Sequence, residues 1–331
     1  MGKLEVTLGI DIGGTNTKLG FVDREGNMLA EASVPTHAEQ PAPFFIAHLH
    51  QAIQMLWRKL PVEVDLKGIG MGAPNANYYR GTVEKPPNLD WGDETPLVAM
   101  VRKHYPVPIV ITNDANAAAL GEMKYGVAQT MKNFIMITLG TGLGSGIVVN
   151  GDLVYGHDGF AGELGHTLVN VNGRYCGCGR RGCLETYVSA TGIRRTVYKL
   201  LADYIEDSEM RQVSFDDLSA EMITEAALRG DKIALEAFEY TSRILAMKLA
   251  DAVAHTSPEA IILFGGLTRA GESLFGPTKR YLEGFLMNIY KGKVKLLRSG
   301  IMDKNVAVLG ASALIWNELD KIKSTEKKAT V

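Results

Sequence analysis

Two segments of the chain share a pattern in which two hydrophobic runs flank a glycine-rich turn. Residues 4–12 (LEVTLGIDI) and 19–23 (LGFVD) are rich in aliphatic side chains and enclose the turn GGTNTK, which predicts an antiparallel pair of strands. Residues 134–151 (FIMITLGTGLGSGIVVNG) repeat the order of strand, glycine turn and returning strand. This repetition predicts two related lobes, each presenting a turn to the same ligand.

Helices are predicted where hydrophobic residues recur at a spacing of three or four. Between residues 44 and 60, Phe45, Leu49 and Ile53 follow this spacing, and Pro61 ends the pattern. Further helices are predicted over residues 96–104, 193–207, 219–229 and 231–255. Short hydrophobic runs predict strands at 109–112, 260–264 and 306–310, the last leading into a helix over 311–322.

Composition and charge exclude some classes of partner but do not identify the function. The 331 residues are 46% hydrophobic and 22% charged, with a formal net charge of −2, so no strong field attracts nucleic acid or a membrane surface. The first residues contain no signal-peptide pattern, and no run reaches the roughly 18 apolar residues of a membrane span. We therefore predict a cytoplasmic protein of two lobes, with no nucleic-acid or membrane partner.

The glycine turns are candidate phosphate sites, because glycine lets backbone amides approach a phosphate closely. None fits the spacing of a Walker A loop or of GxGxxG, and either hairpin turn alone could need glycine only for its backbone conformation. A carboxylate at a strand end, Asp11, could hold Mg²⁺ through water. The candidate nucleotide residues are Asp11, Gly13, Gly14, Thr15, Asn16 and Lys18 in the first turn, Gly140, Thr141 and Gly142 in the second, and Gly265 and Gly266 in the third, which could face the adenine or its ribose.

One aspartate has the position expected of a general base. Asp114 follows the hydrophobic run IVITN and precedes an alanine-rich segment, where a strand delivers side chains to the edge of a sheet. Alternatively, Asp114 could be a helix N-cap with no catalytic role. Phosphoryl transfer to an alcohol, however, needs a carboxylate that accepts the hydroxyl proton, and Asp114 is the candidate.

All three cysteines lie within eight residues, at Cys176, Cys178 and Cys183, and His166 precedes them. This Cys₃His set with short loops predicts a structural zinc site. Unliganded surface thiols, a redox switch and a nucleic-acid zinc knuckle are the alternatives, and the acidic chain argues against the last. Glu163 and Glu185 bracket the cluster and are suitable acceptors for sugar hydroxyls, and the imidazole nitrogen that does not bind metal is free to meet a hydroxyl.

With these residues, the sequence resembles the ROK family (repressors, ORF kinases) of sugar kinases and sugar-responsive repressors. The resemblance runs from Gly9 to about Gly310 and is most specific in GFAGELGH and CGCGRRGCLE. It implies an α/β fold of the actin-like (ribonuclease H-like) type, with two lobes around a central cleft that binds ATP. It also implies a small lobe of residues 1–114 plus 305–331, a large lobe of residues 115–304, and a homodimer or homotetramer.

The resemblance also assigns roles by motif. It makes Asp114 the general base and implies sugar contacts from Asn88, Asn113, Asp114, Glu163, His166 and Glu185. At Asn75 the family usually has glycine, and asparagine best tolerates the left-handed backbone that such a turn requires. The implied reaction is transfer of the ATP γ-phosphate, with Mg²⁺, to the 6-hydroxyl of an aldohexose, most simply glucose. An N-acetylglucosamine or N-acetylmannosamine kinase and a non-catalytic sugar sensor are the alternatives.

Overall fold

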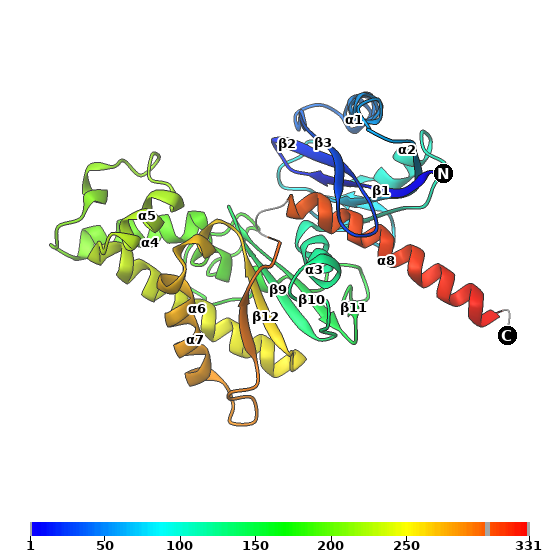
Figure 1. Ribbon diagram of the computed structural model, residues 1–331. Coiled ribbons are helices and arrows are strands. Elements are labelled where there is room, and N and C mark those ends of the chain that lie inside the picture. Colours follow the sequence, from blue (N-terminus) through cyan, green and yellow to red (C-terminus); the bar gives the residue numbers. More distant parts are fainter. Residues whose placement is uncertain (1, 302–304, 330–331) are drawn as a thin grey trace. The chain divides into compact units, whose positions relative to one another are not determined.

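The computed structural model describes residues 2–301 and 305–329 and contains two compact units (Figure 1). Unit 1 comprises residues up to 130, residues 153–161 and residues from 300 onward. Unit 2 comprises residues 131–152 and 162–299. Each unit is therefore built from separate stretches of the chain.

Unit 1 contains a five-stranded mixed sheet in the order β3-β2-β1-β4-β8. The predicted opening pair is present: β1 and β2 are antiparallel, and Asp11 lies opposite Lys18. Strands β4 and β8 run parallel to β1. The strands are β1 (Leu4–Ile12), β2 (Asn16–Val22), β3 (Met28–Pro35), β4 (Val64–Gly72) and β8 (Ile109–Thr112), and a small second sheet contains β5 (Ala76–Asn77), β6 (Thr82–Glu84) and β7 (Glu94–Thr95).

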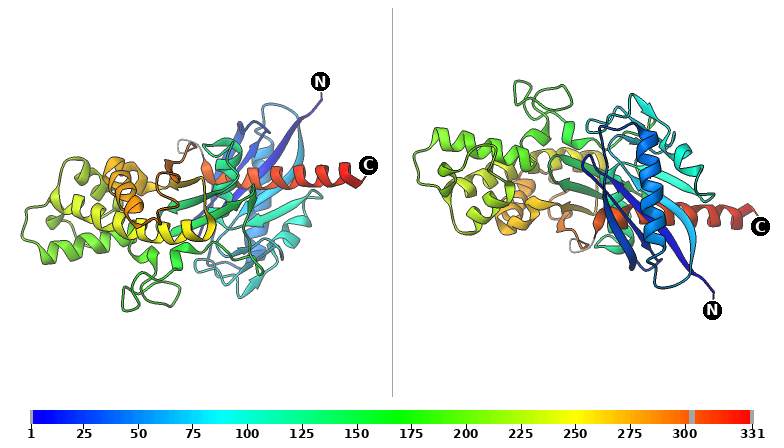
Figure 2. Two further views of the ribbon diagram at one scale, coloured as in Figure 1. Left: turned by 90° about the horizontal axis from the view of Figure 1, so that it is seen from below. Right: turned by 90° about the horizontal axis from the view of Figure 1, so that it is seen from above.

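Successive side chains of β1 point to opposite faces of the sheet, and each face packs against a different helix. Leu8 and Ile10 belong to the hydrophobic core that includes α1, whereas Thr7 on the other face hydrogen-bonds Ser312 of α8 (2.7 Å between hydroxyl oxygens). In Figure 2, α8 continues past the sheet. The helices of unit 1 are α1 (Ala42–Trp57), α2 (Leu97–Arg102), α3 (Asp114–Tyr125) and α8 (Val306–Ala329).

The strand predicted over residues 306–310 is wrong, because these residues form the start of α8. The helix backbone lies directly on the sheet: a Cβ on Gly9 would lie 2.2 Å from the Val308 carbonyl oxygen, and one on Gly70 would lie 1.8 Å from that of Ala311. Val308 is fully buried. A helix start that is buried on all sides lacks the polar positions that distinguish it from a buried strand.

Unit 2 contains a second five-stranded sheet, in the order β11-β10-β9-β12-β13, whose core includes residues from four helices. Its strands are β9 (Phe134–Leu139), β10 (Leu143–Val149), β11 (Asp152–Leu153), β12 (Ala260–Phe264) and β13 (Lys295–Arg298). Its helices are α4 (Ala190–Asp203), α5 (Ala220–Leu228), α6 (Lys232–Thr256) and α7 (Glu272–Phe285), with short 3₁₀ turns η1 (Leu164–His166), η2 (Leu184–Thr186), η3 (Glu209–Gln212) and η4 (Gly266–Ala270).

Hydrophilic residues fix where these helices begin. The side chains of Ser189, Ser219 and Asp231 accept hydrogen bonds from backbone N–H groups in the first turns of α4, α5 and α6. Such N-caps satisfy amide groups that have no partner within the helix. The helices predicted at 193–207, 219–229 and 231–255 are thus found within a few residues of their predicted ends.

A buried carboxylate of unit 1 binds two segments that lie next to the points where the chain passes between the units. Glu122 of α3 is fully buried. Its carboxylate accepts the backbone N–H of Val127 (2.9 Å), shortly before the chain passes into unit 2 after residue 130. It also accepts the N–H of Gly300 (3.1 Å), where the chain has returned to unit 1 after residue 299.

The resemblance implies lobe boundaries at residues 114 and 305, and these boundaries remain a prediction. In the structure α3 packs against α8 within unit 1.

No helix in the described part of the chain is long and apolar enough to cross a membrane.

Candidate active site and metal cluster

The carboxyl ends of three neighbouring strands of unit 1 bring two aspartates together. Asp11 on β1 lies beside Gly72 on β4, and Gly72 lies beside Thr112 on β8. Asp114 follows two residues later, as the first residue of α3. Parallel strands collect ligand-binding side chains at this edge, and Asp11 and Asp114 both lie at it.

Burial raises the pKa of both aspartates. Burial, followed by the negative charge of Asp114, raises the pKa of Asp11 to about 7, against the lowering effect of Lys18. Surrounding protein also raises the pKa of Asp114, while the Ala115 N–H, which donates to it at 2.8 Å, lowers it. Although protein surrounds its carboxyl group, Asp114 as a residue keeps part of its surface exposed to solvent. A raised pKa together with accessibility suits a group that must take up a proton.

The first glycine turn is a tight hairpin between β1 and β2. The Gly13 N–H donates to the carbonyl of Asn16 (3.1 Å), which leaves Gly14 and Thr15 at the tip. A Cβ on Gly14 would lie 2.9 Å from the Cβ of Asn88. The candidate sugar residue Asn88 therefore packs directly against the candidate phosphate turn.

Two asparagines of unit 1 shape the backbone at the candidate site. Asn113, rather than Asp114, is the N-cap of α3, and its Oδ1 accepts the Asn116 N–H (2.7 Å). The cap leaves the Nδ2 of Asn113, a donor, for a ligand. Asn75 has a φ of 52°, so it does adopt the left-handed conformation expected of this turn.

The second glycine turn, in unit 2, is joined to the candidate sugar residue Glu185. The Gly140 N–H donates to the carbonyl of Gly142 (3.0 Å), and the next amide, that of Leu143, donates to Oε2 of Glu185 (3.0 Å). A Cβ on Gly142 would lie 2.2 Å from the same oxygen. Nothing in the sequence pattern places Glu185 beside this turn, because 42 positions separate Leu143 from it.

The third glycine turn lies against the second. Gly265 has a φ of 109°, and a Cβ there would lie 2.4 Å from the carbonyl oxygen of Leu139, the residue before the second turn. Only glycine fits this position without strain. Both turns are therefore parts of one edge of the unit 2 sheet.

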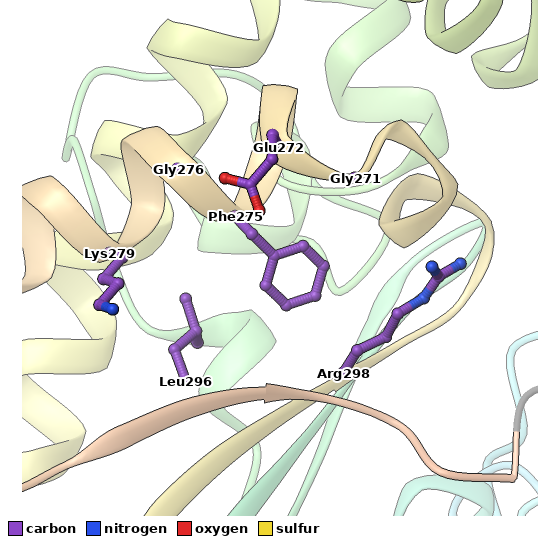
Figure 3. Close-up of a pocket in the computed structure, with 7 residues that line it drawn as sticks. All are labelled: Gly271, Glu272, Phe275, Gly276, Lys279, Leu296 and Arg298. Atoms are coloured by element: carbon purple, nitrogen blue, oxygen red, sulfur yellow. The ribbon is translucent and has the colours of Figure 1, made fainter.

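A pocket of about 380 Å³ opens between α7 and β13, beside Gly271 at the end of η4 (Figure 3). Phe275 and Leu296 give it an apolar wall, and three charged side chains surround it. The third glycine segment, residues 264–272 (FGGLTRAGE), ends at this pocket with Gly271 and Glu272. No motif marks the rest of the lining, which comes from α7 and β13. The lining residues are Gly271, Glu272, Phe275, Gly276, Lys279, Leu296 and Arg298.

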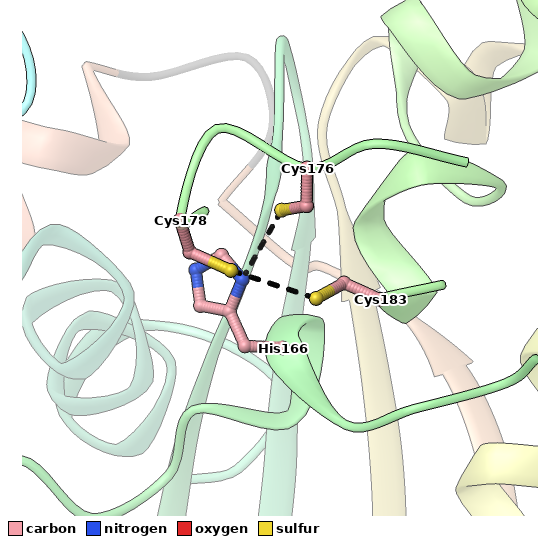
Figure 4. Close-up of side chains that lie close together, drawn as sticks. All are labelled: His166, Cys176, Cys178 and Cys183. Carbon is pink, nitrogen blue, oxygen red and sulfur yellow. Dashed lines mark hydrogen bonds between the residues drawn. The ribbon is translucent and has the colours of Figure 1, made fainter. Parts of the chain in front are cut away.

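The four predicted metal ligands lie together in unit 2 (Figure 4). One ligand atom from each of His166, Cys176, Cys178 and Cys183 lies within 4.8 Å of all the others. Nδ1 of His166 is 3.6 Å from Sγ of Cys176, and Sγ of Cys178 is 3.6 Å from Sγ of Cys183. A tetrahedral zinc with bonds of 2.0–2.3 Å separates such ligands by about 3.5–3.8 Å, so the cluster fits this ion.

The loop that carries the cysteines has the turns and charges of a metal site. Cys176 and Arg180 are joined by a backbone hydrogen bond of 2.9 Å, and a Cβ on Gly182 would lie 1.6 Å from the Asn170 carbonyl oxygen. Burial raises the pKa of Cys176 and Cys183. At Cys178, burial is outweighed by N–H donors of Arg180 and the neighbouring thiols, which lower the pKa to about 6. Thiolates are the form that binds zinc, and Cys178 is the thiol that ionises most readily.

Arg174 fastens the same loop to α4. Its guanidinium donates to the carbonyls of Thr186 (2.8 Å) and Gly192 (2.9 Å) and to the hydroxyl of Thr196 (3.0 Å), and it lies over the ring of Tyr187. No motif in the sequence marks Arg174 for this role. Its contacts hold the loop to α4 in addition to the contacts within the Cys₃His cluster.

The remaining candidates divide between the units. Asn16 and Lys18 extend the first turn along β2, with exposed side chains. Thr141 and Gly266 are exposed at the second and third turns. Glu163 immediately precedes η1, which ends at His166, and its side chain is exposed.

The ROK family sequence profile matches residues 7–318, and the chain belongs to this family. It is 32% identical to a glucokinase from Halalkalibacterium halodurans over 96% of this chain and 98% of that protein. It is 29% identical to an N-acetylmannosamine kinase from Haemophilus influenzae over 96% of this chain and 98% of that protein.

Among solved structures, a ROK-family glucokinase from Streptomyces griseus in complex with glucose and AMPPNP matches with a TM-score of 0.78. The two chains are 33% identical, and the match covers 93% of this chain and 98% of the other. The predicted actin-like α/β fold of two lobes is thereby confirmed. Both the class of enzyme, a sugar kinase, and the family are those that the motifs indicated.

Proposed function

We propose that the protein is an ATP-dependent glucokinase that transfers the γ-phosphate to the 6-hydroxyl of glucose. The observation that carries the proposal is the likeness, over nearly the whole of both chains, to a glucokinase structure that contains glucose and an ATP analogue. The pair of aspartates at the sheet edge of unit 1 supports the same chemistry.

We assign the general-base role to Asp114. It accepts the proton of the sugar hydroxyl as the hydroxyl oxygen attacks the γ-phosphorus, and the bond from that phosphorus to the ADP oxygen breaks. Asp11 is a suitable carboxylate for Mg²⁺, which when bound neutralises phosphate charge. The first and second glycine turns supply backbone N–H donors to the phosphates.

The sugar-binding roles implied by the resemblance are retained as part of the proposal. In unit 1 these residues are Asn88, Asn113 and Asp114; in unit 2 they are Glu163, His166 and Glu185. Because Nδ1 of His166 faces the thiols, its Nε2 is the nitrogen that can meet a hydroxyl. A structural Zn²⁺ at the Cys₃His cluster would fix the loop between Glu163 and Glu185.

We place the base of the nucleotide in the pocket beside Gly271. The chain runs from the third glycine turn through η4 to Gly271 at the edge of the pocket, and the apolar wall of the pocket suits a flat aromatic base. Gly276 offers a direct test, because a Cβ there meets only the flexible end of Glu272, at 3.3 Å. A longer side chain at 276 would therefore fill the pocket with little strain.

The assay that tests the function is ADP release from ATP against glucose, mannose, fructose, N-acetylglucosamine and N-acetylmannosamine. Glucose is expected to give the highest kcat/KM. The likeness to an N-acetylmannosamine kinase makes that sugar the second candidate. Turnover with none of the five would exclude the proposal and favour a non-catalytic sugar sensor.

The general base is tested by Asp114→Asn. Turnover should fall by a factor on the order of 10²–10⁴, as expected for a lost general base, while the Kd for the sugar stays within a few-fold of the original. Near-normal turnover would remove Asp114 from the mechanism.

We further propose a cytoplasmic location and a homodimer or homotetramer. Thiolate ligands for zinc need reducing conditions, as found in the cytosol. Light scattering coupled to size-exclusion chromatography measures the oligomer directly.

A further inference from the structure

In each unit a candidate sugar residue occupies the space in front of a phosphate-turn glycine. In unit 1 this residue is Asn88, against Gly14, and in unit 2 it is Glu185, against Gly142. In each unit, a residue proposed to bind sugar is therefore in direct contact with a turn proposed to bind phosphate. A change in one must be accommodated by the other.

Glu185 makes the closer connection of the two, because it carries a charge. Oε2 accepts the Leu143 N–H at 3.0 Å, and Oε1 lies 3.6 Å from Sγ of Cys176. One carboxylate thus touches both the phosphate turn and the metal loop. The side chain is half-buried, so its charge is only partly screened by water.

The turn itself is attached to the segment that follows Glu185. The Ala190 N–H donates to the carbonyl of Gly140 (2.9 Å), and the Thr191 hydroxyl donates to that of Thr141 (3.2 Å). The position of Glu185 and the conformation of the turn are consequently fixed by the same short stretch of chain.

We propose that Glu185 couples the binding of sugar to the binding of nucleotide. The inference rests on the proposed kinase function. A negative carboxylate beside amides that receive phosphate opposes a second negative charge there. When sugar hydroxyls donate to Glu185, they reduce that opposition, so sugar binding raises the affinity for nucleotide. By linkage, nucleotide raises the affinity for sugar by the same factor.

The sign of this coupling distinguishes it from simple structural damage. In Glu185→Gln the negative charge is gone, and the amide retains a carbonyl oxygen that can accept the Leu143 N–H. Nucleotide should then bind sugar-free protein at least as tightly as it binds the original protein, while sugar binds more weakly. A variant with a damaged site would bind both ligands more weakly.

Two glycines of unit 2, one in the turn and one outside the proposed site, provide a matched pair of variants. A Cβ on Gly142 would collide with Oε2 of Glu185, whereas one on Gly284, in α7, would meet nothing within 4 Å. Neither glycine has a positive φ, so alanine is conformationally acceptable at both. Gly142→Ala should displace Glu185 and weaken sugar binding at least five-fold; Gly284→Ala should leave it within two-fold.

The experiment is calorimetric titration of glucose and of AMPPNP with Mg²⁺, each with and without the other ligand. The original protein, Glu185→Gln, Gly142→Ala and Gly284→Ala are compared, and each variant must have the metal content of the original protein and a similar Tm. The original protein should show a coupling factor on the order of 10, within the range usual for proteins. That factor should persist in Gly284→Ala and fall to within two-fold of one in Glu185→Gln and Gly142→Ala.

A factor near one in the original protein, or full coupling in Glu185→Gln, would overturn the inference while leaving the kinase function intact. Absence of binding by glucose and by every other sugar of the panel would instead overturn the kinase proposal and the coupling with it. If only Gly142→Ala failed to fold, Glu185→Gln would still decide the matter.

Discussion

Asp11 should destabilise the ligand-free fold at neutral and alkaline pH, and its replacement by asparagine should therefore stabilise it. The folded protein holds the pKa of Asp11 at about 7, against 3.8 for an ordinary aspartate. Between these values the folded state keeps a proton that the unfolded chain has lost. Stability must fall as the pH rises through this window, and above it the ionised carboxylate is a constant cost.

The difference between the two pKa values sets a ceiling of about 4 kcal/mol on that cost. We expect about half of it, ~2 kcal/mol, because water reaches this partly buried side chain and lowers the effective cost. In a domain of 150–250 residues, one kcal/mol changes Tm by roughly 2–4 °C. Asp11→Asn should then raise the Tm of unit 1 by about 4–8 °C at pH 8 and by little or nothing below pH 4.

The assay is differential scanning calorimetry from pH 4 to pH 8, without nucleotide and with a chelator of Mg²⁺. Asp93→Asn, an exposed aspartate of the same unit, is the control and should show no such pH-dependent gain. A gain for Asp11→Asn that is equal at pH 4 and pH 8, or a loss at pH 8, would refute the reasoning. The same variant should lose most of its turnover, since it lacks the carboxylate proposed for Mg²⁺.

Three further outcomes can be checked independently. Glu122→Gln leaves one side-chain oxygen for the two N–H groups that Glu122 accepts, and its NH₂ group faces one of these donors. The substitution should therefore cost about 1–3 kcal/mol of unfolding free energy, measured by denaturant titration; an unchanged midpoint would show that Glu122 does not stabilise the fold in this way. Cys183→Ser should lower bound zinc from one per chain to near zero by mass spectrometry and raise the KM for sugar; a normal sugar site without metal would exclude the fastening role. Gly276→Met should raise the KM for ATP several-fold with little change for sugar, whereas Gly284→Met, on the same helix with nothing within 4 Å of its Cβ, should change neither; equal effects would remove the base from this pocket.

The parts of the site that depend on local sequence were predictable. The Cys₃His cluster follows from short spacing, and Asp114 follows from the order of hydrophobic strand and helix. By contrast, the contact between Glu185 and the Leu143 N–H depends on how η2 packs on β10, and no local pattern encodes it. The buried position of Glu122 was equally hidden, because a glutamate in an alanine-rich helix usually faces solvent.

The error at residues 306–310 has the same origin. Val308 lies in a run that is hydrophobic at nearly every position, and such a run fits a buried strand and a buried helix alike. The glycines that decide the matter, Gly9 and Gly70, lie on distant strands. They leave room for a helix backbone, which is information that the run itself does not contain.

The position of α8 has a consequence for synthesis on the ribosome. The sheet of unit 1 is begun by the first residues made, but the helix that covers one of its faces consists of residues 306–329, made after all of unit 2. Until then the face that bears Gly9 and Gly70 lacks its partner, while the β-strands of unit 2 and the helices that pack on them have already been made. The nascent chain therefore exposes an unfinished sheet during most of its translation, the kind of surface that chaperones bind.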